Sequence, residues 1–307
     1  MAINFYEQIA SNKRMTYFLF IIFFVLIGGL AGIISLILGA FGIAFFSVFS
    51  IFAFLIIVFA LISYYSCDSI VTAISGAKEV KGDDPRFRQL FNIVDELRIA
   101  SGLPMPRIFV INDTAINAFA TGRDPEHAVV CVTTGCLTRL NREELQGVVA
   151  HELSHIKNYD IRTMTIASVL VGIAVLLSDL IIRMAFFSRS GSDSRNSGAF
   201  WLVILFIGII LAVLTPIIAQ IINFAISRKR EFLADASAAE MTRNPLGLAS
   251  ALEKISKDTE PLEAANKATA HLYIANPLKG QNLWMANLFS THPPIGERIA
   301  ALRGIKS

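Results

Sequence analysis

The run HELSH at residues 151–155 holds the residue types whose spacing points most directly to chemistry. Its two histidines, His151 and His155, are four residues apart, so a helix places both imidazoles on one side, where two ring nitrogens can bind a single Zn²⁺. Glu152 then lies beside the metal, where a carboxylate can act as a general base. The alternative is a pair of solvated histidines on an ordinary helix face.

A catalytic zinc of this kind takes a third protein ligand and leaves its fourth position to water. Residues 227–240 read SRKREFLADASAAE and place Glu231 and Asp235 one turn apart on an alanine-rich helix. We assign Glu231 as the third ligand and Asp235 as the carboxylate that orients a ligand histidine. Taken without the histidines, the two acids would indicate only an acidic helix face.

Two amphipathic helices and a small sheet are expected to position these residues. Asn141 followed by Glu144 predicts a helix start, and apolar residues then recur on one face over residues 141–160. A second amphipathic helix is expected over residues 84–102. Three β-prone runs separated by turn residues predict a small antiparallel sheet. These runs are residues 107–111, 116–120 and 128–134.

The composition of the chain indicates a membrane protein. Of 307 residues, 54% are hydrophobic and 17% are charged, against about 45–50% and about 25% in a typical soluble domain. Four stretches with few or no charges are long enough for a hydrocarbon core that needs about 20 residues. They are residues 15–38, 41–65, 164–187 and 199–226. We therefore expect an α-helical integral membrane protein with four transmembrane helices.

The expected spans divide the chain into five parts. In order, these are an N-terminal tail (1–14), a first transmembrane hairpin (15–65), a polar block with HELSH (66–162), a second hairpin (163–226) and a second polar block (227–307). Basic residues concentrate in the tail and the blocks and are scarce in the hairpin loops. The positive-inside rule therefore places the N-terminus and both blocks in the cytoplasm.

The charge balance and the cysteines exclude other classes. A formal net charge of +3 is too small a surplus to indicate nucleic acid as a partner. Cys67, Cys131 and Cys136 are an odd number without tight spacing. They predict no disulfide framework, and we expect free thiols in a reducing compartment.

Four motifs together resemble the HtpX-type membrane zinc metalloproteases, which are related to the CAAX prenyl proteases. They are HELSHIKNYD (151–160), REFLADASA (230–238), NAFATG (117–122) and THPPIGERI (291–299). The opening NFYEQIASNKR (4–14) is also similar to the N-terminal tail of that family. The resemblance implies a cytosolic, mainly α-helical α+β domain with a gluzincin-like site. It implies one Zn²⁺ per chain held by His151, His155 and Glu231, with Glu152 as general base.

The resemblance also implies roles for two further motifs. Asn117 and Ala118 would lie on an edge strand beside the cleft, where an extended substrate pairs with the strand and the asparagine side chain holds a substrate carbonyl. His292 would donate to the oxyanion of the tetrahedral intermediate. A hairpin residue without function and a capping or packing histidine are the respective alternatives.

The function implied by the resemblance is endoproteolysis in protein quality control under stress. The substrates would be cytoplasmic parts of misfolded or damaged membrane proteins and other unfolded polypeptides, and the enzyme would work in the bacterial inner membrane alongside ATP-dependent membrane proteases. Three alternatives stay open: a membrane scaffold or adaptor with a structural zinc, a transporter or channel, and a CAAX-type processing protease. The first is disfavoured because a structural zinc normally has four protein ligands, and no fourth is evident beside the HELSH helix.

Overall fold

The computed structural model describes four continuous parts of the chain, together with Pro277 and isolated positions between residues 10 and 25 and between residues 206 and 210. The four parts are residues 45–165, 228–263, 269–275 and 293–305. The expected spans 15–38, 164–187 and 199–226 therefore lie almost wholly outside the described residues.

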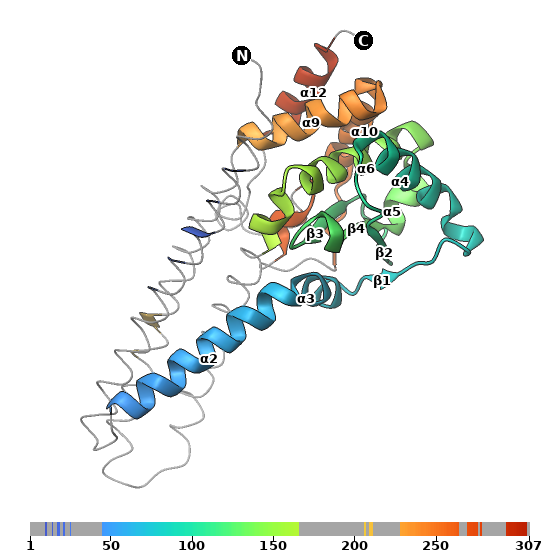
Figure 1. Ribbon diagram of the computed structural model, residues 1–307. Coiled ribbons are helices and arrows are strands. Elements are labelled where there is room, and N and C mark those ends of the chain that lie inside the picture. Colours follow the sequence, from blue (N-terminus) through green and yellow to red (C-terminus); the bar gives the residue numbers. More distant parts are fainter. Residues whose placement is uncertain are drawn as a thin grey trace, which may run out of the picture.

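Helix α2 (Phe45–Tyr65) covers most of the second expected span, residues 41–65. Figure 1 shows this helix extending away from the globular body, with α3 (Cys67–Ile74) at its inner end. Within the part of the chain that the structure describes, no helix combines the length and apolarity needed for a membrane span.

The body contains a four-stranded sheet in the order β1-β2-β4-β3. The strands are β1 (Lys78–Glu79), β2 (Arg107–Ile111), β3 (Ala118–Gly122) and β4 (Ala128–Thr133). The expectation of an antiparallel sheet is wrong, because β2 and β4 pair in parallel while the two outer pairs are antiparallel. After β2 the chain forms β3 at the edge of the sheet and then turns back as β4, which lies between β3 and β2. Strand β4 therefore runs in the same direction as β2.

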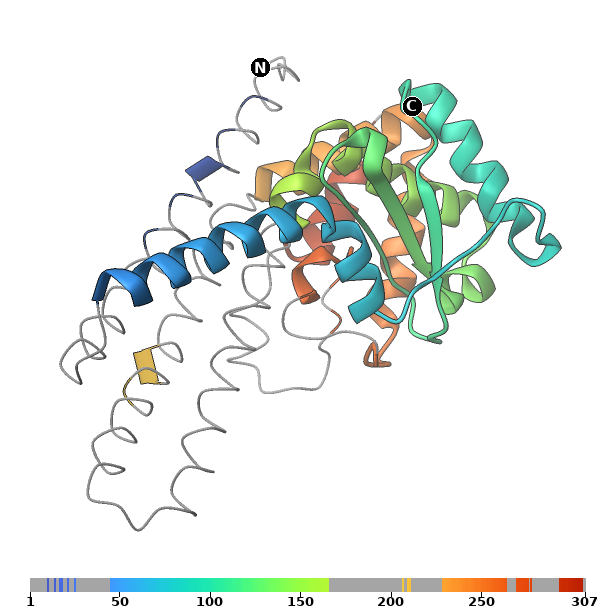
Figure 2. The same ribbon diagram turned by 60° about the horizontal axis from the view of Figure 1, so that its bottom comes forward.

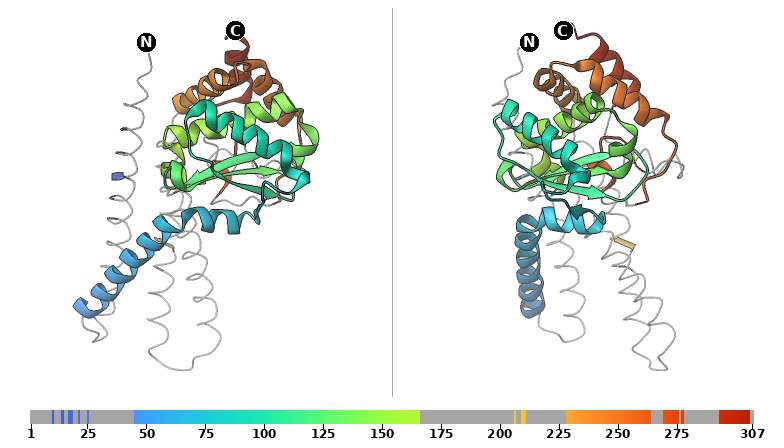
Figure 3. Two further views of the ribbon diagram at one scale, coloured as in Figure 1. Left: turned by 45° about the vertical axis from the view of Figure 1, so that its right-hand side comes forward. Right: turned by 90° about the vertical axis from the view of Figure 1, so that its right-hand side faces the viewer.

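Helices cover one face of the sheet, and α3 lies on the other (Figure 3). Helix α6 (Arg142–Lys157) packs directly on β3 and β4, and α5 (Thr134–Arg139) contacts β4. Helices α4 (Arg88–Ser101), α9 (Arg228–Thr242) and α10 (Pro245–Lys257) pack on α6, and α12 (Ile295–Arg303) packs on α9 and α10. Figure 2 shows the same arrangement from below, with α2 and α3 in front. The two polar blocks of the sequence thus build one core around α6.

Local sequence explains the position of α6. Asn141 and Glu144 form the expected capping box, in which the Asn141 side chain accepts from the Glu144 N–H and the Glu144 carboxylate accepts from the Asn141 N–H. Gly147 lets α6 approach α10 closely, since a Cβ at this position would lie 2.7 Å from the backbone nitrogen of Leu248. Such a contact is far inside van der Waals distance, so the helices could not meet here with a larger residue.

Candidate metal centre

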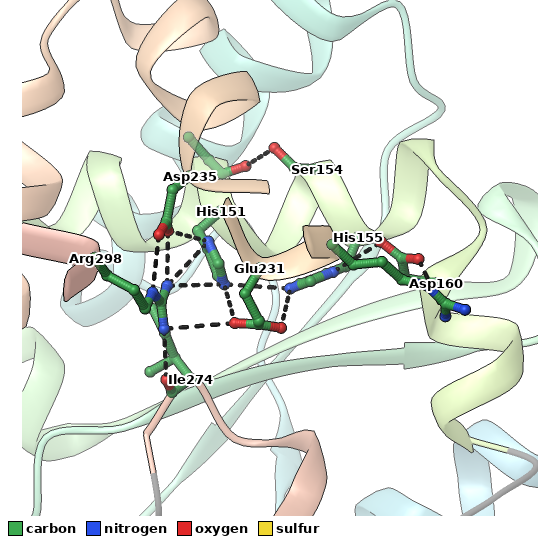
Figure 4. A network of polar contacts seen from close by, with 10 residues as sticks. His151, Ser154, His155, Asp160, Glu231, Asp235, Ile274 and Arg298 are labelled. Carbon is green, nitrogen blue, oxygen red and sulfur yellow. Dashed lines mark hydrogen bonds and ion pairs between the residues drawn. The ribbon is translucent and has the colours of Figure 1, made fainter. Parts of the chain in front are cut away.

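Helices α6 and α9 bring three potential metal donors together. The Nε2 atoms of His151 and His155 lie 3.2 Å apart. Glu231 Oε2 lies 3.7 Å from His151 Nε2, and Glu231 Oε1 lies 3.5 Å from His155 Nε2. All three side chains are buried, and their donor atoms lie within 4.8 Å of one another. Figure 4 shows the two rings and the carboxylate converging on one point.

These distances fit a single zinc ion. Ligand bonds of about 2.0–2.1 Å in tetrahedral geometry place neighbouring donor atoms about 3.4 Å apart. The three donor separations, 3.2, 3.5 and 3.7 Å, lie close to that value. Two neutral imidazoles and one carboxylate are also a donor set that suits zinc.

A carboxylate lies behind each histidine and fixes the orientation of its ring. Asp235 Oδ1 lies 3.0 Å from His151 Nδ1, and Asp160 Oδ2 lies 3.1 Å from His155 Nδ1. Each ring therefore presents Nε2 to the shared point, an arrangement typical of metal sites. The structure places Asp235 where the sequence predicted a histidine-orienting carboxylate. Asp160 was missed, because it follows the end of α6 and reaches His155 only through a turn at Tyr159, whose φ is 60°.

Arg298 is the second residue that sequence reasoning missed. It comes from α12 and is 0% exposed. Its Nε and Nη2 donate to the two carboxylate oxygens of Asp235 at 2.8 and 2.7 Å, and its Nη1 lies 3.5 Å from Glu231 Oε2. Its only sequence signal was its place in the THPPIGERI motif (291–299). The distance of 63 residues to Asp235 along the chain hid the pairing.

Among the residues that the structure describes, the buried charges around the site do not balance without a cation. This part of the chain buries four carboxylates and two guanidiniums there, and with neutral imidazoles they leave an excess of two negative charges. The carboxylates are Glu152, Asp160, Glu231 and Asp235, and the guanidiniums are Arg230 and Arg298. Uncompensated buried charge is costly, so a bound divalent cation would stabilise this cluster.

The pKa values of the site residues reflect the same excess of negative charge. Burial raises the pKa of Glu152 to about 7, and Glu231 adds to the rise. Burial opposes the protonation of His155, but Asp160 and Glu231 outweigh it and raise the pKa of His155 to about 9. Burial together with Arg298 lowers the pKa of His151 to about 4. In the metal-free protein, protons on Glu152 and His155 thus supply part of the missing positive charge.

Glu152 faces the donor cluster from α6 and is 1% exposed. A hydrogen bond from the backbone of Ala120 in β3 stabilises its charged form. Its Oε1 has no hydrogen-bond partner among the described residues. This oxygen is therefore available to a water molecule in the site.

The structure places Asn117 and Ala118 at the outer edge of the sheet, where β3 begins. Asn117 Nδ2 donates to the Ala275 carbonyl at 3.1 Å, and Asn117 Oδ1 accepts from the Ala118 N–H. His292 lies outside the described residues.

His127 and the three cysteines lie away from the donors. His127 is exposed and pairs with Asp124 Oδ1 at 2.6 Å, so it takes no part in the site. The free thiols expected for Cys67, Cys131 and Cys136 are confirmed, and all three lie buried.

The family comparison identifies the class to which this fold and donor set belong. The profile of Peptidase family M48 matches residues 84–306. This stretch contains the HELSH helix, the sheet edge, Glu231 and Arg298. The chain therefore belongs to peptidase family M48, a family of proteases.

Individual relatives match this chain over nearly its full length. The Protease HtpX homolog of Dictyoglomus turgidum is 46% identical over 302 residues, covering 98% of this chain and 94% of that protein. The Protease HtpX homolog of Listeria monocytogenes serotype 4a is 42% identical over 321 residues, covering 98% of this chain and 99% of that protein. The HtpX-type resemblance drawn from the four motifs is thereby confirmed.

One solved structure resembles this chain more distantly. The crystal structure of S. mikatae Ste24p matches with a TM-score of 0.49 and 18% identity. The match covers 96% of this chain and 66% of that one, so this chain spans just under two thirds of its length.

Proposed function

We propose that the chain is a zinc endopeptidase whose metal is held by His151, His155 and Glu231. One observation carries this proposal. Three donors with the spacing of a tetrahedral zinc site lie inside a buried cluster with an excess of two negative charges. Membership of peptidase family M48 supports peptide hydrolysis as the reaction.

The residues of the chain would divide the work of hydrolysis. Zinc, when bound, acts as a Lewis acid that polarises the scissile carbonyl. Glu152 takes a proton from the attacking water and returns it to the leaving amine. In the metal-free protein, burial raises the pKa of Glu152 to about 7; a bound cation would favour the ionised carboxylate, which is the form that accepts a proton from water. Asp160 and Asp235 hold the histidine rings in place for both steps.

A substrate would bind along the outer edge of β3. An extended peptide can add to an exposed strand through main-chain hydrogen bonds, which require no particular side chains. Ala118 supplies a carbonyl for such pairing, and Asn117 supplies an amide donor. We retain His292 as a proposed donor to the oxyanion.

We also propose that the enzyme is anchored in the membrane by four spans, residues 15–38, 41–65, 164–187 and 199–226. Large apolar side chains of α2 are more than half exposed, among them Phe46, Phe54 and Leu61, which is the surface that lipid would cover. At the end of α2, Arg162 donates to the hydroxyl of Tyr64 at 2.8 Å. Aromatic and basic residues together are typical of a membrane interface.

The substrates proposed for this site are cytoplasmic parts of misfolded or damaged membrane proteins. Cleavage would take place at the inner membrane under stress, and ATP-dependent membrane proteases would act alongside this enzyme. Main-chain recognition at a strand edge supports unfolded polypeptides as the substrate class. A scaffold with a structural zinc and a CAAX-type processing protease are the competing functions.

Reconstitution with zinc tests the proposed function. The full chain is purified in detergent with a chelator, Zn²⁺ is added, and cleavage of casein and of the chain itself is followed on gels. Glu152→Ala serves as the parallel variant. Zinc-dependent cleavage that is absent from the variant supports the protease. If the wild type binds one zinc per chain but does not cleave, the scaffold function replaces it.

A further inference from the structure

Residues 273–275 form a short segment, here called the strap, that lies against the outer edge of β3. The Ile274 N–H donates to the Ala118 carbonyl at 2.9 Å. Asn117 Nδ2 donates to the Ala275 carbonyl at 3.1 Å. Arg298 Nη1 donates to the Ile274 carbonyl at 3.1 Å. The strap is therefore held by a strand edge, an asparagine amide and the guanidinium of the metal centre.

All three contacts use only main-chain groups of the strap. One N–H and two successive carbonyls are bound, so the same partners would hold any extended peptide. Figure 4 shows that the Ile274 carbonyl meets Arg298 beside the donor cluster. Because Arg298 Nη1 lies 3.1 Å from the Ile274 carbonyl and 3.5 Å from Glu231 Oε2, a single guanidinium group separates the strap from the proposed zinc ligand Glu231. The strap thus has the contacts expected of a bound substrate.

We propose that the strap occupies the substrate position of the active site and must leave before a polypeptide can be cleaved. This inference rests on the proposed peptidase function. Ile274 stands for the substrate residue next to the scissile bond, and a substrate strand takes over its contacts with Ala118, Asn117 and Arg298. The Ile274 side chain is 1% exposed, so an apolar side chain is the preferred occupant at this position.

A strap that is tethered in the substrate position affects KM in particular. The strap is part of the same chain, so it competes with free substrate at a high effective concentration. Competition of this kind raises KM, while kcat stays that of the fully substrate-bound enzyme. Weakening the strap should therefore lower KM and leave kcat unchanged.

Tyr273 anchors the strap without belonging to the substrate contacts. Its ring packs edge to face on the ring of Phe119, with centroids 5.0 Å apart and an interplanar angle of 75°. The Tyr273 side chain is buried, whereas the main-chain contacts are made by its neighbours. Tyr273→Ala thus loosens the strap and leaves Ala118, Asn117 and Arg298 intact.

The test compares casein cleavage by three zinc-loaded proteins in detergent: wild type, Tyr273→Ala and Leu90→Ala. Leu90 lies in α4 and is also a buried core residue, so its truncation controls for a general loss of packing. We expect KM to fall about 2-fold to 10-fold in Tyr273→Ala, the range of an aromatic pair, with kcat unchanged. We expect no fall in KM for Leu90→Ala. Unchanged or higher KM in Tyr273→Ala overturns the proposal.

A second measurement covers the case in which Tyr273→Ala does not fold. Amide hydrogen exchange is followed in Glu152→Gln, with and without saturating casein. Faster exchange at the Ile274 amide in the presence of casein supports displacement, and unchanged protection in the complex overturns it. If zinc-loaded wild type cleaves nothing, the proposed function itself fails, and this outcome is distinct from cleavage with an unchanged KM.

Discussion

Asp235→Ala should lower the zinc affinity of the protein about 10-fold to 100-fold, the usual effect of losing a carboxylate that orients a metal-binding histidine. Asp235 Oδ1 lies 3.0 Å from His151 Nδ1, and both side chains are buried. Without the carboxylate, the His151 ring is free to rotate away from the shared point, and its Nε2 becomes a poorer ligand.

Two further effects decide whether this loss is seen in full. Protons compete with zinc for a histidine, but burial lowers the pKa of His151 to about 4, so the ring is already neutral at pH 7.5. Removing Asp235 therefore does not raise the zinc affinity by weakening the competition of protons for His151. The change also leaves Arg298 without its bidentate partner, 3.3 Å from His151 Nε2. With Asp235 gone, Glu231 is the carboxylate that still pairs with Arg298, and this less compensated cation opposes zinc binding and acts in the same direction.

The assay is a competition titration with a chromogenic zinc chelator at pH 7.5, on the full chain in detergent. Glu240→Ala is the matched control, because Glu240 is an exposed acid on the same helix, α9. The double variant Asp235→Ala with Arg298→Met separates ring orientation from the charge effect. An affinity for Asp235→Ala within twofold of the control would refute the orienting role.

Two other predictions concern the stability of the fold. Glu144 accepts hydrogen bonds from Lys254 and Ser250 at 2.7 Å each. Burial opposes the ionisation of Glu144, but these bonds hold its pKa below the usual 4.5. A carboxyl with a lowered pKa stabilises the fold above its unfolded pKa and loses this effect as pH falls through the folded value. Glu144→Gln should therefore cost about 1–3 kcal/mol at pH 7, and denaturant unfolding should show this difference closing below about pH 4; a constant difference would contradict the assignment. Gly147→Ala should lower the free energy of unfolding by about 1–3 kcal/mol, because the added Cβ would lie 2.7 Å from the Leu248 nitrogen. The better helix propensity of alanine is worth only about 1 kcal/mol, and a net rise in melting temperature would refute the close approach.

The parts of the site that depend on local sequence could be predicted. The spacing of His151 and His155 fixes their shared face on α6, and the capping pair at Asn141 fixes where that helix starts. Glu231 and Asp235 are likewise one turn apart on α9, so their common side followed from helix geometry.

The parts that depend on long-range packing could not be predicted. Arg298 reaches Asp235 across 63 residues, and no periodicity marks such a pairing. The parallel pairing of β2 with β4 depends on β3 taking the outer position, which short β-prone runs do not reveal. The contact of Ile274 with Ala118 joins segments from both polar blocks and appears only once they are packed together.

The most direct test of the central claim separates metal binding from chemistry at neighbouring residues. Zinc content and casein cleavage are measured on the same preparations of wild type, Glu152→Gln and His155→Ala. We predict that Glu152→Gln keeps one zinc per chain and loses nearly all cleavage, whereas His155→Ala loses both. Full cleavage by Glu152→Gln, or a full zinc content in His155→Ala, would contradict the account.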